Sequence, residues 1–215
     1  QEDYENPNLL FLGTELGLYI TINGGDRWSK FTKNVPPVAV HYIELQSQTN
    51  DLVIGTHGRG VIIIDDISPL REINDDNLSN KLYFFERDQF EIQEFGGFSD
   101  SFGRETQFFG ANPSLSCEIQ YLLPKRHTFG KMTMEIQDMD GNKITTLNPG
   151  KSKGINTVNW SYNMRTPKIA KAKTLSFGGF TSPTVPAGDY KVVIKKGRDT
   201  FEKVINVAYK NNAGL

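Results

Sequence analysis

The sequence contains little of what marks several large classes of protein. It has a single cysteine, Cys117, so no disulfide can form within the chain. The neighbours of Cys117 in SLSCEIQYLL predict a small buried strand residue rather than a nucleophile. Basic and acidic residues number 24 and 25, so no overall charge favours nucleic acid or an anionic membrane, and any binding must be local.

Long apolar runs and targeting signals are missing too. The longest apolar run, 61–64, is far shorter than the roughly 18 residues that a membrane-spanning helix needs, so we expect no membrane insertion. The first residues, QEDYENPN, have neither the basic start nor the apolar segment of a signal peptide. Because Gln1 stands in place of a methionine, we expect either a removed signal or a chain that begins inside a longer protein.

An internal repeat dominates the first third of the sequence. LLFLGTELGLYITI (9–22) can be laid over DLVIGTHGRGVIII (51–64), which places Gly13 over Gly55 at a spacing of 42 residues. Four-stranded propeller blades repeat about every 40 to 45 residues, and the apolar residues here alternate or run in short blocks without a helical period. The repeat predicts blade strands at 9–14, 17–22, 28–32, 40–46, 52–56 and 60–65.

Two blades do not make a closed propeller. Closure takes roughly four or more blades, and a lone pair leaves apolar faces and a strand edge exposed. We therefore expect residues 1–72 to be the last two blades of a larger propeller whose other blades lie upstream. The range 73–113 is predicted to be a polar linker followed by an irregular Phe- and Gly-rich connection, FGGFSDSFGRETQFFGANP (95–113).

Short strands return in the last part of the sequence. They are predicted at 115–122, 132–138, 143–147, 156–162, 173–177, 189–195 and 201–207, between turn signals such as Asp140-Gly141 and Lys196-Gly197. About seven strands at this spacing predict an immunoglobulin-like β-sandwich over 114–210, so the whole chain is expected to be all-β. Without a cysteine pair, Trp160 and alternating aliphatic residues must supply the core of the sandwich.

The segment TINGGDRW (21–28) fits the Asp-box pattern S/T-x-D/N-x-G-x-x-W through Thr21, Asn23, Gly25 and Trp28. With it, the chain resembles the C-terminal part of a bacterial sortilin-like or BNR-repeat propeller protein, often labelled glycosyl hydrolase or sialidase-like. GTHGRGVIIIDDISPLRE resembles the exit of that family's last blade, and FFGANPSLSCEIQYLL resembles its entry into the appended domain. GINTVNWSYNMRTP and VPAGDYKVVI are similar to the immunoglobulin-like domain of flagellar-hook-capping type in secreted Bacteroidetes proteins.

The resemblance implies a secreted, periplasmic or cell-surface protein in which Asp boxes lie on the blade periphery, away from the central site. Asn23 replaces the more usual Asp, and Arg27 stands where Thr is common, which predicts weaker hydrogen bonding within the turn. The Asp box is then a structural turn: Asn23 accepts from backbone N–H groups two residues on, the glycines permit positive φ, and the buried Trp28 ring covers the hairpin. The cysteine-rich module of animal sortilins is absent.

GTHGRG (55–60) is the weak candidate for a catalytic or ligand-binding site. It leads into VIII, another strand, so it lacks the helix N-terminus of a phosphate-binding loop. His57 and Arg59 could serve as a general base and an anion clamp at a propeller's inner loops. The alternative is a hairpin whose glycines serve the turn and whose charges are solvated.

Glycoside hydrolysis places demands that the sequence does not visibly meet. A sialidase needs three converging arginines, and the blades hold only Arg27, Arg59 and Arg71. Other glycosidases need two separated carboxylates, whereas adjacent Asp65 and Asp66 are expected to point to opposite faces of a strand and to serve its end. No metal or cofactor site is expected, because the histidines are far apart in sequence and DMDG (138–141) lacks the remaining ligands of a calcium loop.

Two classes of function follow. The first is a binding or scaffolding module whose partners are upstream blades of the same parent protein and a glycan or protein ligand, with no nucleic acid. The second is a glycoside hydrolase whose active site is completed by upstream blades, with His57 and Arg59 at its rim. A further alternative is a proteolytic fragment retained in an envelope complex. The absence of a visible acid pair favours the first.

Overall fold

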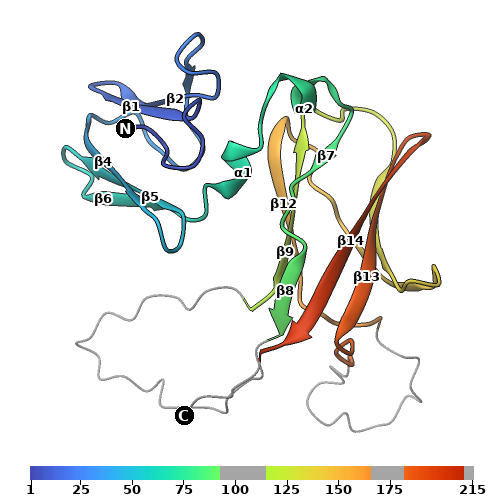
Figure 1. The fold of residues 1–215 in the computed structure, drawn as a ribbon. Helices are drawn as coiled ribbons and strands as arrows, with labels where there is room; N and C mark the ends of the chain where they lie inside the picture. The colour runs from blue at the N-terminus through green and yellow to red at the C-terminus, as the bar shows by residue number, and fades with distance from the viewer. Residues whose placement is uncertain (93–114, 166–181, 211–215) are drawn as a thin grey trace, which may run out of the picture. The chain divides into compact units, whose positions relative to one another are not determined.

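The computed structural model describes residues 1–92, 115–165 and 182–210, and these form an all-β protein with several antiparallel sheets (Figure 1). The chain divides into two compact units, Gln1–Phe85 and Glu86–Leu215. The Phe- and Gly-rich segment at 95–113 and the predicted strand at 173–177 lie outside the described residues.

The first sheet of the first unit follows the chain in order. It contains β1 (Leu10–Thr14), β2 (Gly17–Thr21) and β3 (Ser29–Lys30), each antiparallel to the next. The first residues extend this sheet beyond β1, because Phe11 N donates to Gln1 O at 2.8 Å and Asp3 N donates to Leu9 O at 3.0 Å. Four segments of chain therefore lie side by side, although the first forms only an isolated bridge, between Glu2 and Leu10.

The second sheet of this unit is also built in chain order, from β4 (Val40–Gln46), β5 (Asp51–Thr56) and β6 (Val61–Ile64). Its strands start and end within one residue of the predicted ranges, because alternating Val, Ile and Leu residues are bounded by Gly and Asn turns. Only β3 is much shorter than the predicted 28–32, since it pairs with β2 over two residues.

The two sheets of the first unit pack closely at Gly13. A Cβ atom there would lie 2.6 Å from Val40 O and 2.8 Å from Val40 Cγ1, so only glycine fits without displacement. Phe11 and Leu18, on the same face of the first sheet as Gly13, are buried, and so are Leu52 and Ile54 of the second sheet. The face of the first sheet that carries Gly13 is therefore covered by the second sheet.

Two short helices follow β6, the first at the end of the range predicted to be blades and the second in the range predicted to be a polar linker. α1 (Ser68–Arg71) starts with Pro69 in its first turn, and α2 (Asp75–Ser79) is capped by Asn74, whose side chain accepts from Asn77 N at 2.9 Å. β7 (Tyr83–Phe84) ends the unit. The segment at 73–113, predicted to be a linker and connection, therefore contains regular structure in its first part.

Arg71 of α1 holds the start of the chain in place through a buried ion pair. Its Nε and Nη2 atoms donate to the two oxygens of Asp3, each at 2.9 Å, and Nη1 donates to Asn50 Oδ1 at 2.8 Å. The guanidinium also lies 4.7 Å from the centre of the Tyr4 ring. The guanidinium of Arg71 thus joins three segments: the residues before β1, the turn before β5 and the helix after β6.

The pKa of Asp3 lies below its ordinary value. Burial opposes ionisation of this carboxyl, but hydrogen bonds from Arg71 and from the backbone N–H groups of Asn6 and Glu5 outweigh that effect. A lowered folded pKa means that the stabilisation is complete above the unfolded carboxyl pKa of about 3.9 and is lost as the pH falls through the folded pKa.

The second unit contains two sheets. The larger has the order β11-β10-β13-β14-β8 and the smaller pairs β12 with β9. All neighbours are antiparallel except β8 and β14, which run parallel from Gln89 opposite Asn206 to Ile92 opposite Tyr209. The strands are β8 (Gln89–Ile92), β9 (Cys117–Leu123), β10 (Met132–Gln137), β11 (Lys143–Leu147), β12 (Gly154–Trp160), β13 (Gly188–Lys196) and β14 (Asp199–Tyr209).

Trp160 lies in the core of the second unit, as predicted. Its ring packs edge-on against Tyr190 of β13, with the ring centres 5.7 Å apart, and its Nε1 donates to Asn163 O at 3.1 Å. Alternating buried residues of β10, such as Met134 and Ile136, complete the same layer. Each sheet turns its apolar face inward because side chains alternate along a strand.

Cys117, at the start of β9, is buried and carries a free thiol, as predicted from its neighbours. Burial raises the pKa of the thiol to about 12. A thiol that is inaccessible and protonated at neutral pH is a poor nucleophile, so this cysteine serves packing.

We predict that Arg71→Ala lowers the free energy of unfolding by about 3–5 kcal/mol at pH 7, because it leaves the buried Asp3 carboxylate unpaired. Urea denaturation of the wild type and variant measures this loss, and the difference should shrink below about pH 4 as Asp3 protonates. Arg59→Ala, on an exposed turn, is the control and should change stability by less than about 0.5 kcal/mol. A loss as small as that of the control would contradict a structural role for Arg71.

We also predict that Cys117 is unreactive toward a thiol reagent such as 5,5′-dithiobis(2-nitrobenzoate) at pH 8 in the folded protein. It should react fully once the protein is unfolded in urea, because unfolding removes the burial that raises the pKa. The absorbance of the released thiolate measures both states. Rapid stoichiometric reaction of the folded protein would show that the thiol is accessible.

Candidate functional site

The Asp-box segment forms the turn between β2 and β3, and Thr21 is its centre. The buried Thr21 Oγ1 accepts from Asn23 N at 3.3 Å and from Gly25 N at 3.2 Å, and it donates to Asn23 Oδ1 at 2.7 Å. Asn23 Oδ1 also accepts from Arg27 N at 3.0 Å. The predicted role of Asn23 is corrected here: Asn23 accepts from the backbone N–H four residues on, whereas the acceptor for an N–H two residues on is Thr21.

Two glycines of this turn have backbone angles that favour glycine. Gly24 and Gly25 have φ values of 68° and 104°, which side chains rarely adopt. Trp28 lies beside Gly25, with its ring 3.9 Å from the place of a Cβ atom there, but 38% of its surface is exposed. The ring lies over the turn, as predicted, but the prediction that it is buried was wrong, because more than a third of its surface is in solvent.

The GTHGRG segment forms the turn between β5 and β6. Thr56 N and Thr56 Oγ1 both donate to Gly60 O, at 3.0 and 2.7 Å, which closes the turn. Gly58 and Gly60 have positive φ values. The side chains of His57 and Arg59 are exposed, and neither forms an ion pair with the described residues.

His41 and His57 come together in space, which their sequence separation concealed. Their ring centres lie 5.5 Å apart, and His41 Nε2 lies 3.8 Å from Glu15 Oε1. All three side chains are exposed at the turn end of the two sheets. Within the described ranges, no group of three or more His, Cys, Asp or Glu residues has an arrangement that could hold a metal ion.

The candidate arginines and aspartates of the first unit do not form one cluster. The donors of Arg71 are directed to Asp3 and Asn50, whereas Arg27 and Arg59 are exposed. β6 ends at Ile64, so Asp65 and Asp66 follow the strand, and the prediction that they project from its two faces was wrong. Asp66 Oδ1 accepts from Ser68 N at 3.1 Å, which fits the predicted role at a strand end.

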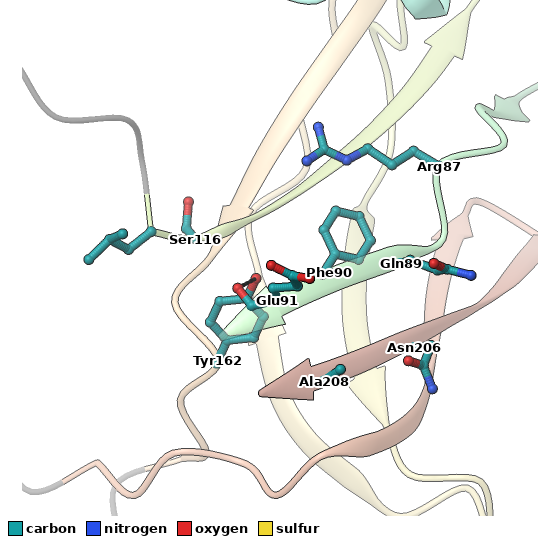
Figure 2. A pocket seen from close by; sticks show the side chains of 9 residues that line it. Arg87, Gln89, Phe90, Glu91, Ser116, Tyr162, Asn206 and Ala208 are labelled. Carbon is teal, nitrogen blue, oxygen red and sulfur yellow. Dashed lines mark hydrogen bonds between the residues drawn. The ribbon is translucent and has the colours of Figure 1, made fainter. Parts of the chain in front are cut away.

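The second unit contains a cavity of about 410 Å³ that was not predicted from the sequence (Figure 2). Its walls come from β8, from the start of β9 and from the end of β14, and β8 was itself not predicted. The lining includes Arg87, Gln89, Glu91, Ser116, Tyr162 and Asn206. Its volume is in the range of small-molecule sites, about 300–1,000 Å³.

The side chains of this cavity suit polar contacts rather than hydrolysis. Figure 2 shows Glu91 and Tyr162 side by side, and Tyr162 Oη donates to the Glu91 carbonyl at 3.2 Å. The guanidinium of Arg87 lies 5.3 Å from the centre of the Phe90 ring. Glu91 is the only carboxylate of the described lining, so the cavity lacks the pair of carboxylates that glycoside hydrolysis requires. Burial raises the pKa of Tyr162 to about 12, so its hydroxyl is neutral at pH 7.

Three exposed large apolar side chains of the first unit lie on one face of the β4-β5-β6 sheet. Tyr42 lies opposite Gly55, which lies opposite Val61, and in the next row Val53 lies opposite Ile63. Tyr42, Val61 and Ile63 are 63%, 66% and 57% exposed. We refer to these five residues as the outer face.

The repeat relates the outer face to a surface that is covered elsewhere in the unit. Gly13 pairs with Leu18 as Gly55 pairs with Val61, so Leu18 and Val61 hold the same place in the two sheets. Leu18 has no exposed surface, whereas its equivalent Val61 is exposed. The sequence shows the repeat, but only the strand pairing shows which residues face outward.

Comparison with known proteins gives one weak likeness. No protein-family model matches the chain, and no curated protein matches it. A solved structure of PorZ, an essential bacterial surface component of the type-IX secretion system of Porphyromonas gingivalis, matches with 13% sequence identity and a TM-score of 0.31. The match covers 96% of this chain, which spans 22% of the PorZ chain. So weak a likeness assigns neither a function nor a location.

Within the described residues, no helix is long and apolar enough to cross a membrane.

We predict that Thr21→Val lowers the free energy of unfolding by about 1–3 kcal/mol, because it leaves the N–H groups of Asn23 and Gly25 without their acceptor. Trp28→Ala should cost about 1–2 kcal/mol, less than a fully buried tryptophan, because part of the ring is already in solvent. Thermal and urea unfolding measure both values. Arg27→Ala is the control, since only its backbone N–H joins the turn, and a comparable loss in that variant would contradict this account of the turn.

Proposed function

We propose that this chain is the C-terminal part of a secreted or cell-surface β-propeller protein of the BNR or sortilin-like kind, and that it acts as a binding or scaffolding module. In this proposal the two sheets of the first unit are the last two blades, and the second unit is an appended immunoglobulin-like sandwich. The observation that carries the proposal is the outer face of the β4-β5-β6 sheet.

The outer face has the composition of an interface between blades. Its equivalent in the first sheet carries the buried side chains of Phe11 and Leu18 and approaches Val40 of the second sheet at Gly13. Burying each Val or Ile side chain stabilises a protein by about 1.5–3 kcal/mol, so a third sheet of the same kind would gain several kcal/mol by covering the outer face. Glu44 lies opposite Val53 on the same face, and exposed apolar surface beside polar residues is typical of an interaction site.

The face of the first sheet that points away from the second sheet supports the same proposal. Leu12 and Tyr19 lie opposite each other on the face of the first sheet that points away from the second. Leu12 is exposed and Tyr19 is half-buried. Both ends of the two-sheet stack therefore present apolar side chains, as expected for an internal piece of a ring of blades.

The chemistry of the side chains favours binding over hydrolysis. His57 and Arg59 are exposed, Arg71 is engaged by Asp3, and the cavity of the second unit is lined by one carboxylate. Neither the arginine cluster of a sialidase nor a carboxylate pair is assembled from the described residues. A ligand surface built from turns and sheet faces needs no such groups.

The test compares Val61→Ser/Ile63→Ser in two proteins: the 215-residue chain and a longer parent protein that includes the upstream sequence. In the chain alone both positions are exposed, so the double variant should change stability by less than about 0.5 kcal/mol. In the parent a neighbouring blade covers them, and the same variant should lose about 2–4 kcal/mol. Denaturant unfolding measures both values.

Leu18→Ala is the matched control, because Leu18 is already fully buried within the 215-residue chain. It should cost about 2–5 kcal/mol in both. If the double variant has the same small effect in the parent as in the chain, no sheet covers the outer face and the propeller proposal is wrong.

A further inference from the structure

Three loops meet at one end of the second unit. They are 124–131 between β9 and β10, 148–153 between β11 and β12, and 196–199 where β13 turns into β14. Hydrogen bonds join them: His127 N donates to Lys151 O at 3.0 Å, and Gly197 N donates to Lys131 O at 3.4 Å. We call this continuous surface the basic end, for the reason given next.

Positive charge is concentrated on the basic end. Six of its basic side chains are exposed: Lys125, Arg126, Lys131, Lys151, Lys153 and Arg198. They are a quarter of the 24 basic residues of a chain whose net charge is −1. Asp199 is the only carboxylate in the three loops, and none of the six forms an ion pair with the described residues. Like charges gathered without partners raise a local positive potential that the whole chain does not have.

An aromatic side chain stands among these charges. Phe129, in the loop 124–131, is 88% exposed, which is more than any other large apolar side chain described. The adjacent Gly130 has a φ of 90°, so the loop turns sharply directly after the ring. Because Phe129 contributes so little to the core, its ring is available for contact with a partner.

We propose that the basic end is a peripheral binding surface for an anionic lipid bilayer. Lysine and arginine side chains meet the phosphates of the headgroups, and the Phe129 ring enters the boundary between headgroups and acyl chains. The contact is interfacial and needs no membrane-spanning segment. It concerns the second unit and stands independently of the blade interface proposed for the first.

The single exposed aromatic favours lipid over nucleic acid. Proteins that hold single-stranded nucleic acid stack successive bases on several aromatic side chains along a basic groove. The three loops contain one such ring besides His127, whose Nε2 is buried. One apolar ring surrounded by lysines and arginines has the composition of an interfacial anchor.

The first experiment is co-sedimentation of the 215-residue chain with vesicles at low ionic strength. We expect binding to vesicles of phosphatidylcholine with phosphatidylglycerol and none to pure phosphatidylcholine. Each lysine near an anionic surface contributes about five-fold to binding, so Lys125→Glu/Lys151→Glu should weaken it by about 25-fold or more. Lys33→Glu/Lys143→Glu changes the net charge equally outside the basic end and should alter binding by less than about two-fold.

The second experiment isolates the role of the ring. Phe129→Ser should weaken vesicle binding by about ten-fold or more while leaving the melting temperature unchanged, because the ring is exposed. Phe129→Trp should bind anionic vesicles as tightly as the wild type does. The fluorescence of the new tryptophan should shift to shorter wavelength when these vesicles are added. Equal binding to pure phosphatidylcholine, an equal loss in the Lys33/Lys143 variant, or tighter binding to a single-stranded oligonucleotide than to anionic vesicles would each overturn the proposal.

Discussion

An antiparallel sheet with an apolar face must have that face covered, and both units of this protein are organised by that requirement. In the second unit the two sheets cover each other, with Trp160 and Tyr190 in contact between them. In the first unit the two sheets cover only one face each, and the close approach of Gly13 to Val40 marks that contact. The outer face with Val61 and Ile63 is left in solvent, and the proposal of further blades follows from this difference between the units.

The buried pair of Arg71 and Asp3 adds a constraint of another kind. The cost of removing two charges from water offsets most of their attraction, so such a pair adds little net stability. Its main effect is to hold the chain in one arrangement. Here it fixes the residues before β1 against the helix that follows β6. Arg71 was considered in the sequence as one of the arginines that could bind a substrate. Its hydrogen bonds to Asp3 instead give it a structural role.

Patterns that are local in sequence predicted local structure well. β4 and β11 have the predicted bounds, because alternation and turn residues act within a few positions. β8 was missed because Gln89–Ile92 is short and half polar, and its partner β14 lies over a hundred residues away. The proximity of His41 and His57, the cavity beside β8 and the exposure of Trp28 depend on which strands become neighbours. The spacing of apolar residues along the sequence does not show which strands become neighbours.

The parallel pairing of β8 with β14 has a consequence for how the second unit forms. Gln89 opens the unit and Asn206 lies near its end, so the edge of the larger sheet is complete only when almost the whole unit has been synthesised. Contacts between residues so far apart in the chain are slow to form, because a long loop has to close first. During translation β8 therefore waits without a partner until β14 leaves the ribosome. A chain that ends before residue 206 would leave it unpaired permanently, as an open edge prone to aggregation.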